Sequence, residues 1–401
     1  MTTIATFGAL SHGANAADFT STGRLSIQGS YETNPELRRS NKTHVAERQL
    51  SPGWVGEWDG ETYGLDFDLG ATFVRTSDET ITPDSLRYDT TVAGDVDLDR
   101  VRLSGSLDYS LSAFDNTEFN DNELTTDADS ASVSNDVQVD DVSLTTRFEY
   151  DWSDRMSLFL EDSFRAVSFS GGNSTDFTNT TVATGVSYDW SDVITITPRV
   201  EYRKFEPADT EPTNVIETSM GINHQLNDTS TYNLTVGMLR TGSERKVTFD
   251  ASYEKTFEEY VLRLTGNRDV TPSDDGELRE SRSLGFDIAH ALSATTRAGI
   301  DGLWRENDDL EARRLGFNMS HDVSPDVVLG FTVNVVQSIS ENLAGTTKEM
   351  QYRADPFLNW TFAENLNARF SYRELWEDTD NQGSVNTRRA TVAVTYTHPF
   401  N

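Results

Sequence analysis

The sequence predicts an all-β protein, a closed antiparallel up-and-down transmembrane β-barrel of about twenty strands, with about eighteen as the alternative. The first observation behind this prediction is the alternation of apolar and polar residues, which is clearest in residues 63–73, 101–111 and 390–400. One face of each run carries Leu, Val, Phe, Ala or Tyr, while the other is mostly polar. Such runs exceed the roughly five or six residues of an ordinary strand and match the ~9–11 residues that a tilted strand needs to cross a bilayer.

The second observation is a turn motif that recurs along the chain. The segment Tyr150 to Asp154 is repeated identically at Tyr188 to Asp192, and weaker copies follow farther along. A strand–turn–strand unit with this recurrence is a hairpin repeat. The predicted strands, in order, are 24–33, 43–58, 61–75, 84–96, 100–114, 137–152, 155–169, 178–190, 193–206, 213–226, 230–240, 245–256, 259–269, 280–292, 296–306, 310–323, 326–340, 346–361, 365–377 and 385–400.

The third observation is that the connections alternate between short and long. Short turns at 58–60, 153–154, 191–192, 227–229 and 324–325 alternate with longer polar segments at 115–136, 170–177, 207–212, 270–279, 306–309 and 378–384. This asymmetry is typical of outer-membrane barrels, and an even strand number places both termini at the periplasmic, short-turn rim. A soluble β-sandwich is disfavoured, because its outward faces would be polar.

Composition is compatible with this class and excludes one kind of partner. The 401 residues are 36% hydrophobic, the mean hydropathy is -0.54, and cysteine is absent. A barrel tolerates such values because only alternate residues face lipid. The net charge of -33 argues against nucleic acid as a partner.

The chain divides into a short N-terminal segment and one domain. Residues 1–20 are predicted to be a signal-peptide remnant, because a short apolar run leads to Ala14-Asn15-Ala16, which resembles a cleavage site. No Lys or Arg precedes Arg24, so a flexible N-terminus is the alternative. Residues 21–401 are predicted to form the barrel of a Gram-negative outer membrane.

The aromatic residues of the repeated turns predict a girdle at the periplasmic rim. An amphipathic ring there keeps its body in lipid and its polar atom among the head groups. His224, His290, His321 and His398 occupy equivalent positions, where anchoring outweighs metal binding because a ring of hairpins spreads them apart. The predicted girdle is Tyr150, Trp152, Tyr188, Trp190, Tyr253, Trp360 and Tyr396.

The polar face of the strands predicts a lumen rich in arginine. The planar guanidinium group binds carboxylate or phosphate through two parallel hydrogen bonds, so these residues could hold an anionic solute. Alternatively, they form ion pairs that link neighbouring strands. We expect basic side chains to exceed acidic ones on this face. The predicted set, here called the basic ladder, is Arg102, Arg147, Arg165, Arg199, Arg203, Arg263, Arg297, Arg305, Arg314, Arg353, Arg369, Arg373 and Arg389.

Neither a cofactor nor a dedicated metal site is predicted. Acidic residues crowd the long connections at 115–136, 274–280 and 377–380 and could take Ca²⁺ or Mg²⁺, but none has the spacing of a calcium loop. No G-x-S-x-G motif and no recognisable pairing of Ser, His and carboxylate occurs. We therefore expect no enzymatic activity, with a lipid- or glycan-modifying outer-membrane enzyme as the alternative.

The opening segment Gly29-Ser30-Tyr31-Glu32-Thr33-Asn34-Pro35 and the repeated turn resemble the β-barrel porin type 2 outer-membrane proteins associated with exopolysaccharide loci. The resemblance spans nearly the whole chain as a pattern, without diagnostic residues. It implies an outer-membrane barrel linked to export or surface assembly of polysaccharide. The chain departs from the usual ending, because Asn401 follows the last aromatic residue, Phe400.

Together these features predict a porin-like channel of the cell outer membrane that passes or exports an anionic solute or polysaccharide. A non-conducting surface-assembly or binding barrel is the alternative outside the enzyme class. The predicted partners are outer-membrane lipid, lipopolysaccharide and the barrel-insertion machinery, together with anionic polysaccharide and its export machinery.

Overall fold

The computed structural model describes residues 18–34, 43–79, 84–113, 138–170, 175–272, 278–307, 310–342, 345–379 and 383–400. In this part of the chain no helix is long and apolar enough to cross a membrane. The predicted signal-peptide segment lies largely outside the described residues, and the first strand begins at Asp18, earlier than the predicted start at residue 24.

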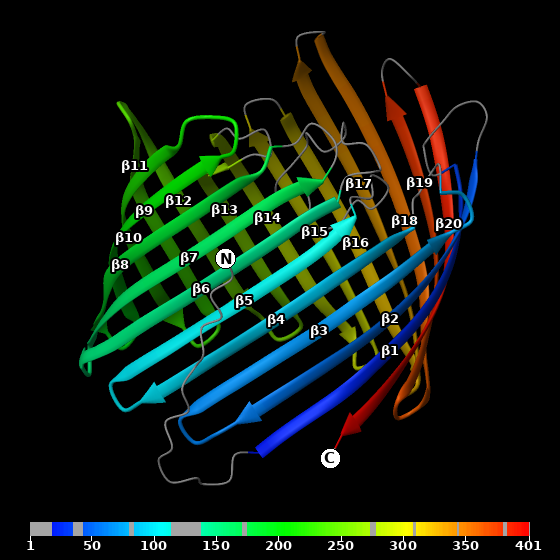
Figure 1. The fold of residues 1–401 in the computed structure, drawn as a ribbon, viewed down its shortest axis with the longest axis horizontal. Coiled ribbons are helices and arrows are strands. Elements are labelled where there is room, and N and C mark those ends of the chain that lie inside the picture. Colours follow the sequence, from blue (N-terminus) through cyan, green and yellow to red (C-terminus); the bar gives the residue numbers. More distant parts are fainter. Residues whose placement is uncertain are drawn as a thin grey trace.

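Twenty antiparallel strands form one closed sheet, which confirms the predicted fold class (Figure 1). Each strand pairs with the next in sequence, and the last pairs with the first from Ser21↔Phe400 to Thr33↔Arg388. Closure removes the exposed edges that an open sheet would leave unpaired. The strands are β1 (Asp18–Thr33), β2 (His44–Asp59), β3 (Tyr63–Thr76), β4 (Ser85–Leu98), β5 (Val101–Ala113), β6 (Gln138–Ser153), β7 (Met156–Ser170), β8 (Phe177–Ser191), β9 (Ile194–Pro207), β10 (Thr213–Asn227), β11 (Ser230–Thr241), β12 (Glu244–Thr256), β13 (Tyr260–Pro272), β14 (Leu278–Ser293), β15 (Thr296–Asn307), β16 (Leu310–Ser324), β17 (Val327–Asn342), β18 (Gly345–Ala363), β19 (Leu366–Thr379) and β20 (Gly383–Phe400).

The two rims differ as predicted. The turns at the rim where β1 begins and β20 ends, the lower rim of Figure 1, are all short. The longest connection, between Ala113 and Gln138, is at the other rim. That rim is more varied than expected, because the connections from Thr241 to Glu244 and from Asn307 to Leu310 are tight. By analogy with outer-membrane barrels, the short-turn rim is periplasmic and the other extracellular.

The repeated turn motif has a structural cause, which is a β-bulge just before the periplasmic turn. The register shifts between Asp151 and Ser153 and again between Asp189 and Ser191, so Trp152 and Trp190 are the extra residues. Ser153 Oγ then accepts a hydrogen bond from the backbone N–H of Arg155 at 3.4 Å. A bulge re-aims its extra side chain, and these two Trp side chains are 61% and 65% exposed. Equivalent shifts precede the turns after β10, β14, β16 and β18.

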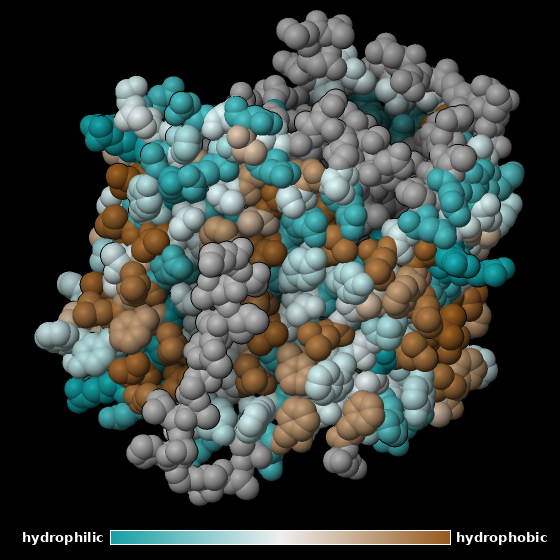
Figure 2. Space-filling view, viewed as in Figure 1, coloured by the Kyte–Doolittle hydropathy of each residue, from teal (hydrophilic) through white to brown (hydrophobic). Residues whose placement is uncertain are grey.

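The outer surface carries an apolar band. Figure 2 shows brown, hydrophobic residues across the middle of the barrel and teal residues along its upper edge. Residues paired across neighbouring strands share a face, and rows such as Leu160–Phe148 and Phe164–Leu144 place exposed apolar side chains on the outside. The residues of the predicted girdle all lie near the periplasmic ends of outward-facing rows. A second set near the extracellular side, including Tyr109, Tyr202 and Tyr352, was not predicted.

Candidate functional site: the inner wall of the barrel

The inner wall is wide enough for its sectors to act separately. Twenty strands spaced about 4.8 Å apart and tilted by about 40° give a backbone diameter of roughly 40 Å. Charges on opposite walls are therefore separated by more than the ~10 Å over which 0.1 M salt screens them. Each sector can be described by the charges on its own strands.

The structure places every member of the basic ladder on the inner face. Arg102, for example, alternates with the exposed Leu103 and pairs across the strands with Glu149 and Asp97. The same alternation with lipid-facing residues holds for the others: Arg147, Arg165, Arg199, Arg203, Arg263, Arg297, Arg305, Arg314, Arg353, Arg369, Arg373 and Arg389. Whether these residues bind a solute stays a prediction.

The expectation that basic side chains exceed acidic ones on this face is wrong. On β1–β5 alone, the described inner face carries Arg24, Arg87 and Arg102 against Asp18, Glu32, Glu47, Glu57, Asp59, Asp66, Asp68, Asp89, Asp95, Asp97 and Asp108. The alternation of β4 contains the signal for four of the residues that were missed, Arg87, Asp89, Asp95 and Asp97. The lumen is therefore charged in sectors and is not uniformly basic.

One sector, here called the paired wall, comprises the inner faces of β5–β9. Arg102 Nη2 lies 3.0 Å from Glu149 Oε1, and Arg147 contacts both Glu149 and Glu161. The chain of contacts continues through Arg199 and Glu201 to Arg203, with oxygen–nitrogen distances of 2.8–2.9 Å. Arg165 adds a separate pair with Asp141 at 2.6 Å. Each arginine of the ladder in this sector thus has a carboxylate on the same or a neighbouring strand.

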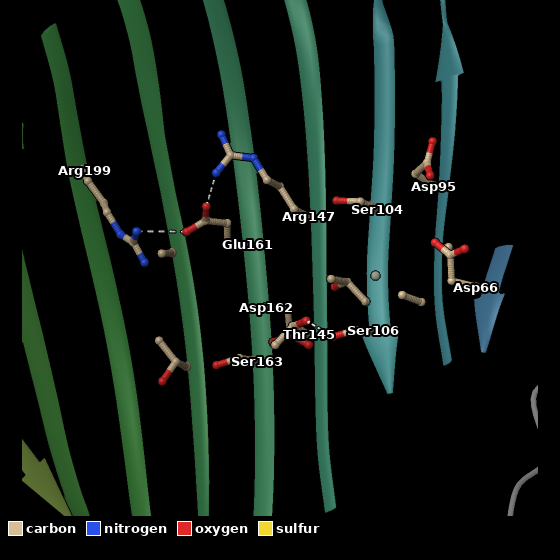
Figure 3. Close-up of a pocket in the computed structure, with 16 residues that line it drawn as sticks. Asp66, Asp95, Ser104, Ser106, Thr145, Arg147, Glu161, Asp162, Ser163 and Arg199 are labelled. Carbon is tan, nitrogen blue, oxygen red and sulfur yellow. Dashed lines mark hydrogen bonds and ion pairs between the residues drawn. The ribbon is translucent and has the colours of Figure 1, made fainter. Parts of the chain in front are cut away.

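A hollow of about 470 Å³ lies at the edge of the paired wall. Figure 3 shows Glu161 between Arg147 and Arg199 on one side of it, with dashed lines to both. Asp66 and Asp95 lie on the other side, separated from the arginines by small hydroxyl side chains such as Ser106 and Thr145. The hollow is therefore a polar surface with an ion-paired end and an anionic end.

The acidic wall comprises the inner faces of β2–β4. Besides Glu47, which pairs with Arg389 where the barrel closes, its carboxylates are the set Glu57, Asp59, Asp66, Asp68, Asp89, Asp95 and Asp97. Among the described residues, Arg24 is the one cation that forms an ion pair with this set, 3.3 Å from Asp68. A smaller hollow of about 280 Å³ lies between Arg24, Asp68 and Asp89. This wall can attract cations and repels anionic groups.

The arginine wall comprises the inner faces of β15–β20. Within the described chain, Arg297 has no ion pair, and Arg369 has none either but lies over the Phe357 ring at 4.6 Å. Both are near the periplasmic ends of their strands. Arg353 and Arg373 contact the same carboxylate, Asp355. This sector therefore presents guanidinium groups that can accept an external anion.

Arg389 in this wall has a structural role at the closure of the barrel. Its guanidinium group is almost completely buried and reaches across β1 to Glu47, with Nη2 3.2 Å from Oε2. Glu32 on β1 lies on the same side at 3.9 Å. Thr387 Oγ1 also donates to the carbonyl oxygen of Thr33 at 2.6 Å. These contacts link β20, β1 and β2.

The remaining candidate residues are dispersed. His224, His290, His321 and His398 lie on four separate outward rows, and no group of three or more potential ligands that could hold a metal occurs among the described residues. Most of the acidic loop residues lie outside the described residues: Asp115, Glu118, Asp121, Glu123, Asp127, Asp129, Asp136, Asp274, Asp275, Glu277 and Asp380. Glu280, Glu377 and Asp378 belong to strand ends.

Solved structures with a similar fold are outer-membrane proteins. The barrel is similar to the siderophore receptor PirA from Acinetobacter baumannii, with a TM-score of 0.55, 8% identity, and coverage of 94% of this chain and 80% of that one. A mutant of the ferric enterobactin receptor PfeA from Pseudomonas aeruginosa gives a TM-score of 0.54 at 8% identity, with the same coverage. OpdQ from Pseudomonas aeruginosa is matched over 96% of this chain and 100% of that one at 12% identity, with a TM-score of 0.46. No family model and no curated protein matches the sequence.

At these identities the similarity concerns the fold alone. Together with the apolar outer band, it defines the class of the protein as a large transmembrane β-barrel of the outer membrane. The narrower resemblance to exopolysaccharide-associated porins stays a prediction.

Proposed function

We propose that the protein is a non-catalytic outer-membrane channel whose arginine wall guides an anionic solute, such as an oligosaccharide that carries uronate or phosphate groups. The observation that carries this proposal is the position of Arg297 and Arg369, which face the lumen without a carboxylate partner among the described residues. A guanidinium group with free donors binds carboxylate or phosphate in a bidentate manner. The fold that the chain shares with siderophore receptors supports a transport role.

The acidic wall would confine an anionic solute to one side of this wide lumen. An anionic chain is repelled by Asp66, Asp95 and their neighbours and is attracted to the arginine wall, which is separated from the acidic wall by β1. Because both unpaired arginines lie near the periplasmic rim, they would be reached first by a solute that enters from the periplasm. Export of an acidic polysaccharide, delivered by periplasmic machinery, is the form of the function that agrees with the family resemblance.

The test is conductance in planar bilayers with and without an acidic probe, such as a short oligogalacturonate. The wild-type barrel should give discrete conductance steps that the probe blocks, and the block should weaken as salt rises. The double variant Arg297→Gln/Arg369→Gln should weaken the block by about tenfold or more, since each charged hydrogen bond contributes about 1.5–3 kcal/mol. Arg313→Gln is the matched control, because Arg313 lies on the outer face beside Glu311.

Three other outcomes contradict the proposal. An unchanged block in the double variant would show that the arginine wall does not bind the probe. Hydrolysis of lipid or glycan by a non-conducting barrel would support the enzyme alternative. A barrel that neither conducts nor hydrolyses would support a surface-assembly or binding role.

A further inference from the structure

The barrel wall divides near the extracellular end of β13. β12 and β13 pair from Thr256↔Val261 only as far as Phe249↔Arg268. Above that point β12 stays paired with β11 up to Glu244, whereas β13 stays paired with β14 up to Pro272↔Leu278. The end of the β13–β14 hairpin, residues 269–272 and 278–281, has therefore separated from β12. This segment is called the hairpin tip below.

The apolar contacts of the hairpin tip place it inside the barrel. Val270 packs against Val215 of β10 and Leu239 of β11 in one buried cluster. Both wall residues belong to inner-face rows, since Val215 pairs with Arg203 and Leu239 with Glu217. Side chains that point into the lumen can be covered only from the lumen side, and all three of these residues are at most 4% exposed. The tip thus forms a second layer on the inner face of β10 and β11.

Polar contacts hold the same arrangement. Arg203 of β9 donates a hydrogen bond from Nη1 to the carbonyl oxygen of Val270 at 2.6 Å. Its Nη2 atom lies 2.8 Å from Glu201, which fixes the guanidinium group. Lys246, on the inner face of β12, lies 3.5 Å from Glu280 of the tip. Four wall strands, β9 to β12, therefore contact the hairpin tip.

We propose that the hairpin tip is the constriction element of the channel, and that Arg203 is a positioning residue that fixes it. This inference rests on the proposed channel function. A strand layer packed on a sheet occupies about 10 Å, which is roughly a quarter of a ~40 Å barrel. The tip therefore narrows the extracellular half of the lumen on the side of β9–β12 and sets the upper size of the solute that passes.

The position of the tip is tested by cross-linking between two introduced cysteines. The chain contains no native cysteine that could form a competing link. The double variant Leu239→Cys/Val270→Cys should form an intramolecular link in the folded barrel, either on oxidation or with a short bis-maleimide. A barrel that inserts and resists SDS like wild type but does not cross-link would overturn the inner-layer arrangement.

The role of the tip is tested by releasing it. Val270→Asp places a charge against two buried apolar residues, and Arg203→Met removes the hydrogen bond to the tip, so both should raise single-channel conductance by about 1.5-fold. They should also admit larger neutral sugars in liposome swelling. Arg203→Lys keeps a donor and should restore most of the wild-type value. Val247→Ala, on the lipid face of neighbouring β12, is the control. It should change neither the single-channel conductance nor the uptake of neutral sugars.

The outcomes separate this inference from the channel proposal. If wild type conducts and the released variants conduct identically to it, the constriction role is wrong while the channel stands. If the cross-link forms but wild type never conducts, both proposals are wrong.

Discussion

The paired wall and the arginine wall contain the same side chain in two different electrostatic settings. On β5–β9 the guanidinium groups alternate with carboxylates in a continuous series from Arg102 to Arg203. On β15–β20, Arg297 and Arg369 face the lumen without such a partner among the described residues. The difference teaches that facing the lumen does not make an arginine available to a solute.

Register is the physical origin of this difference. A carboxylate neutralises an arginine when it lies beside it on the adjacent strand, as Glu161 does opposite Arg147. Arg297 instead lies opposite Ala291 on one side and Ser320 on the other. The first wall is therefore stabilised by its own charges, while the second keeps part of its binding capacity.

The largest expected effect tests which side chains face the lipid and which face the lumen. Val333→Arg places a cation on the lipid face of β17 and should destabilise the inserted barrel by about 2–4 kcal/mol. Thr332→Arg, one residue earlier, faces the lumen opposite Asp355 and should be tolerated. Unfolding in lipid vesicles, followed by Trp fluorescence against urea, measures both. Equal losses for the two variants would contradict the assignment of faces.

A smaller effect is expected from breaking the paired wall. Glu161→Gln leaves Arg147 and Arg199 without their shared carboxylate, and should cost about 1–2 kcal/mol because all three groups are partly exposed. Arg297→Gln, in the arginine wall, should leave stability unchanged. If Glu161→Gln and Arg297→Gln shift the urea midpoint by the same amount, the ion pairs of the paired wall do not stabilise the barrel.

The smallest effect is expected from giving Arg297 a partner. Ala291→Glu introduces a carboxylate directly opposite Arg297 and should stabilise the barrel by no more than about 0.5 kcal/mol. The same variant should weaken the block by an acidic oligosaccharide, because the new ion pair competes with the probe. Ala291→Gln is the uncharged control. A block that stays at the wild-type level in the Glu variant would argue against Arg297 as a contact for the solute.

Much of the fold followed from local pattern. The alternation in 63–73 and its counterparts predicted the strands and their faces, and the repeated turns predicted which ends are periplasmic. The predicted excess of basic side chains in the lumen was wrong because acids such as Asp89 and Asp95 also lie inside, where the same alternation places them. The hairpin tip could not be predicted, since its residues continue the alternation of a wall strand while its backbone leaves the wall.

The sequence by itself predicted the class of sheet, about twenty strands, the two rims and the face of the side chains within the wall. These properties depend on period-two alternation and on turn chemistry, which act between residues close in the chain. Only the tertiary structure decided which arginines are neutralised and that β13 and β14 bend inward against Val215 and Leu239. Those features depend on cross-strand register and on contacts such as that between Arg203 and Val270, which join residues far apart in the chain.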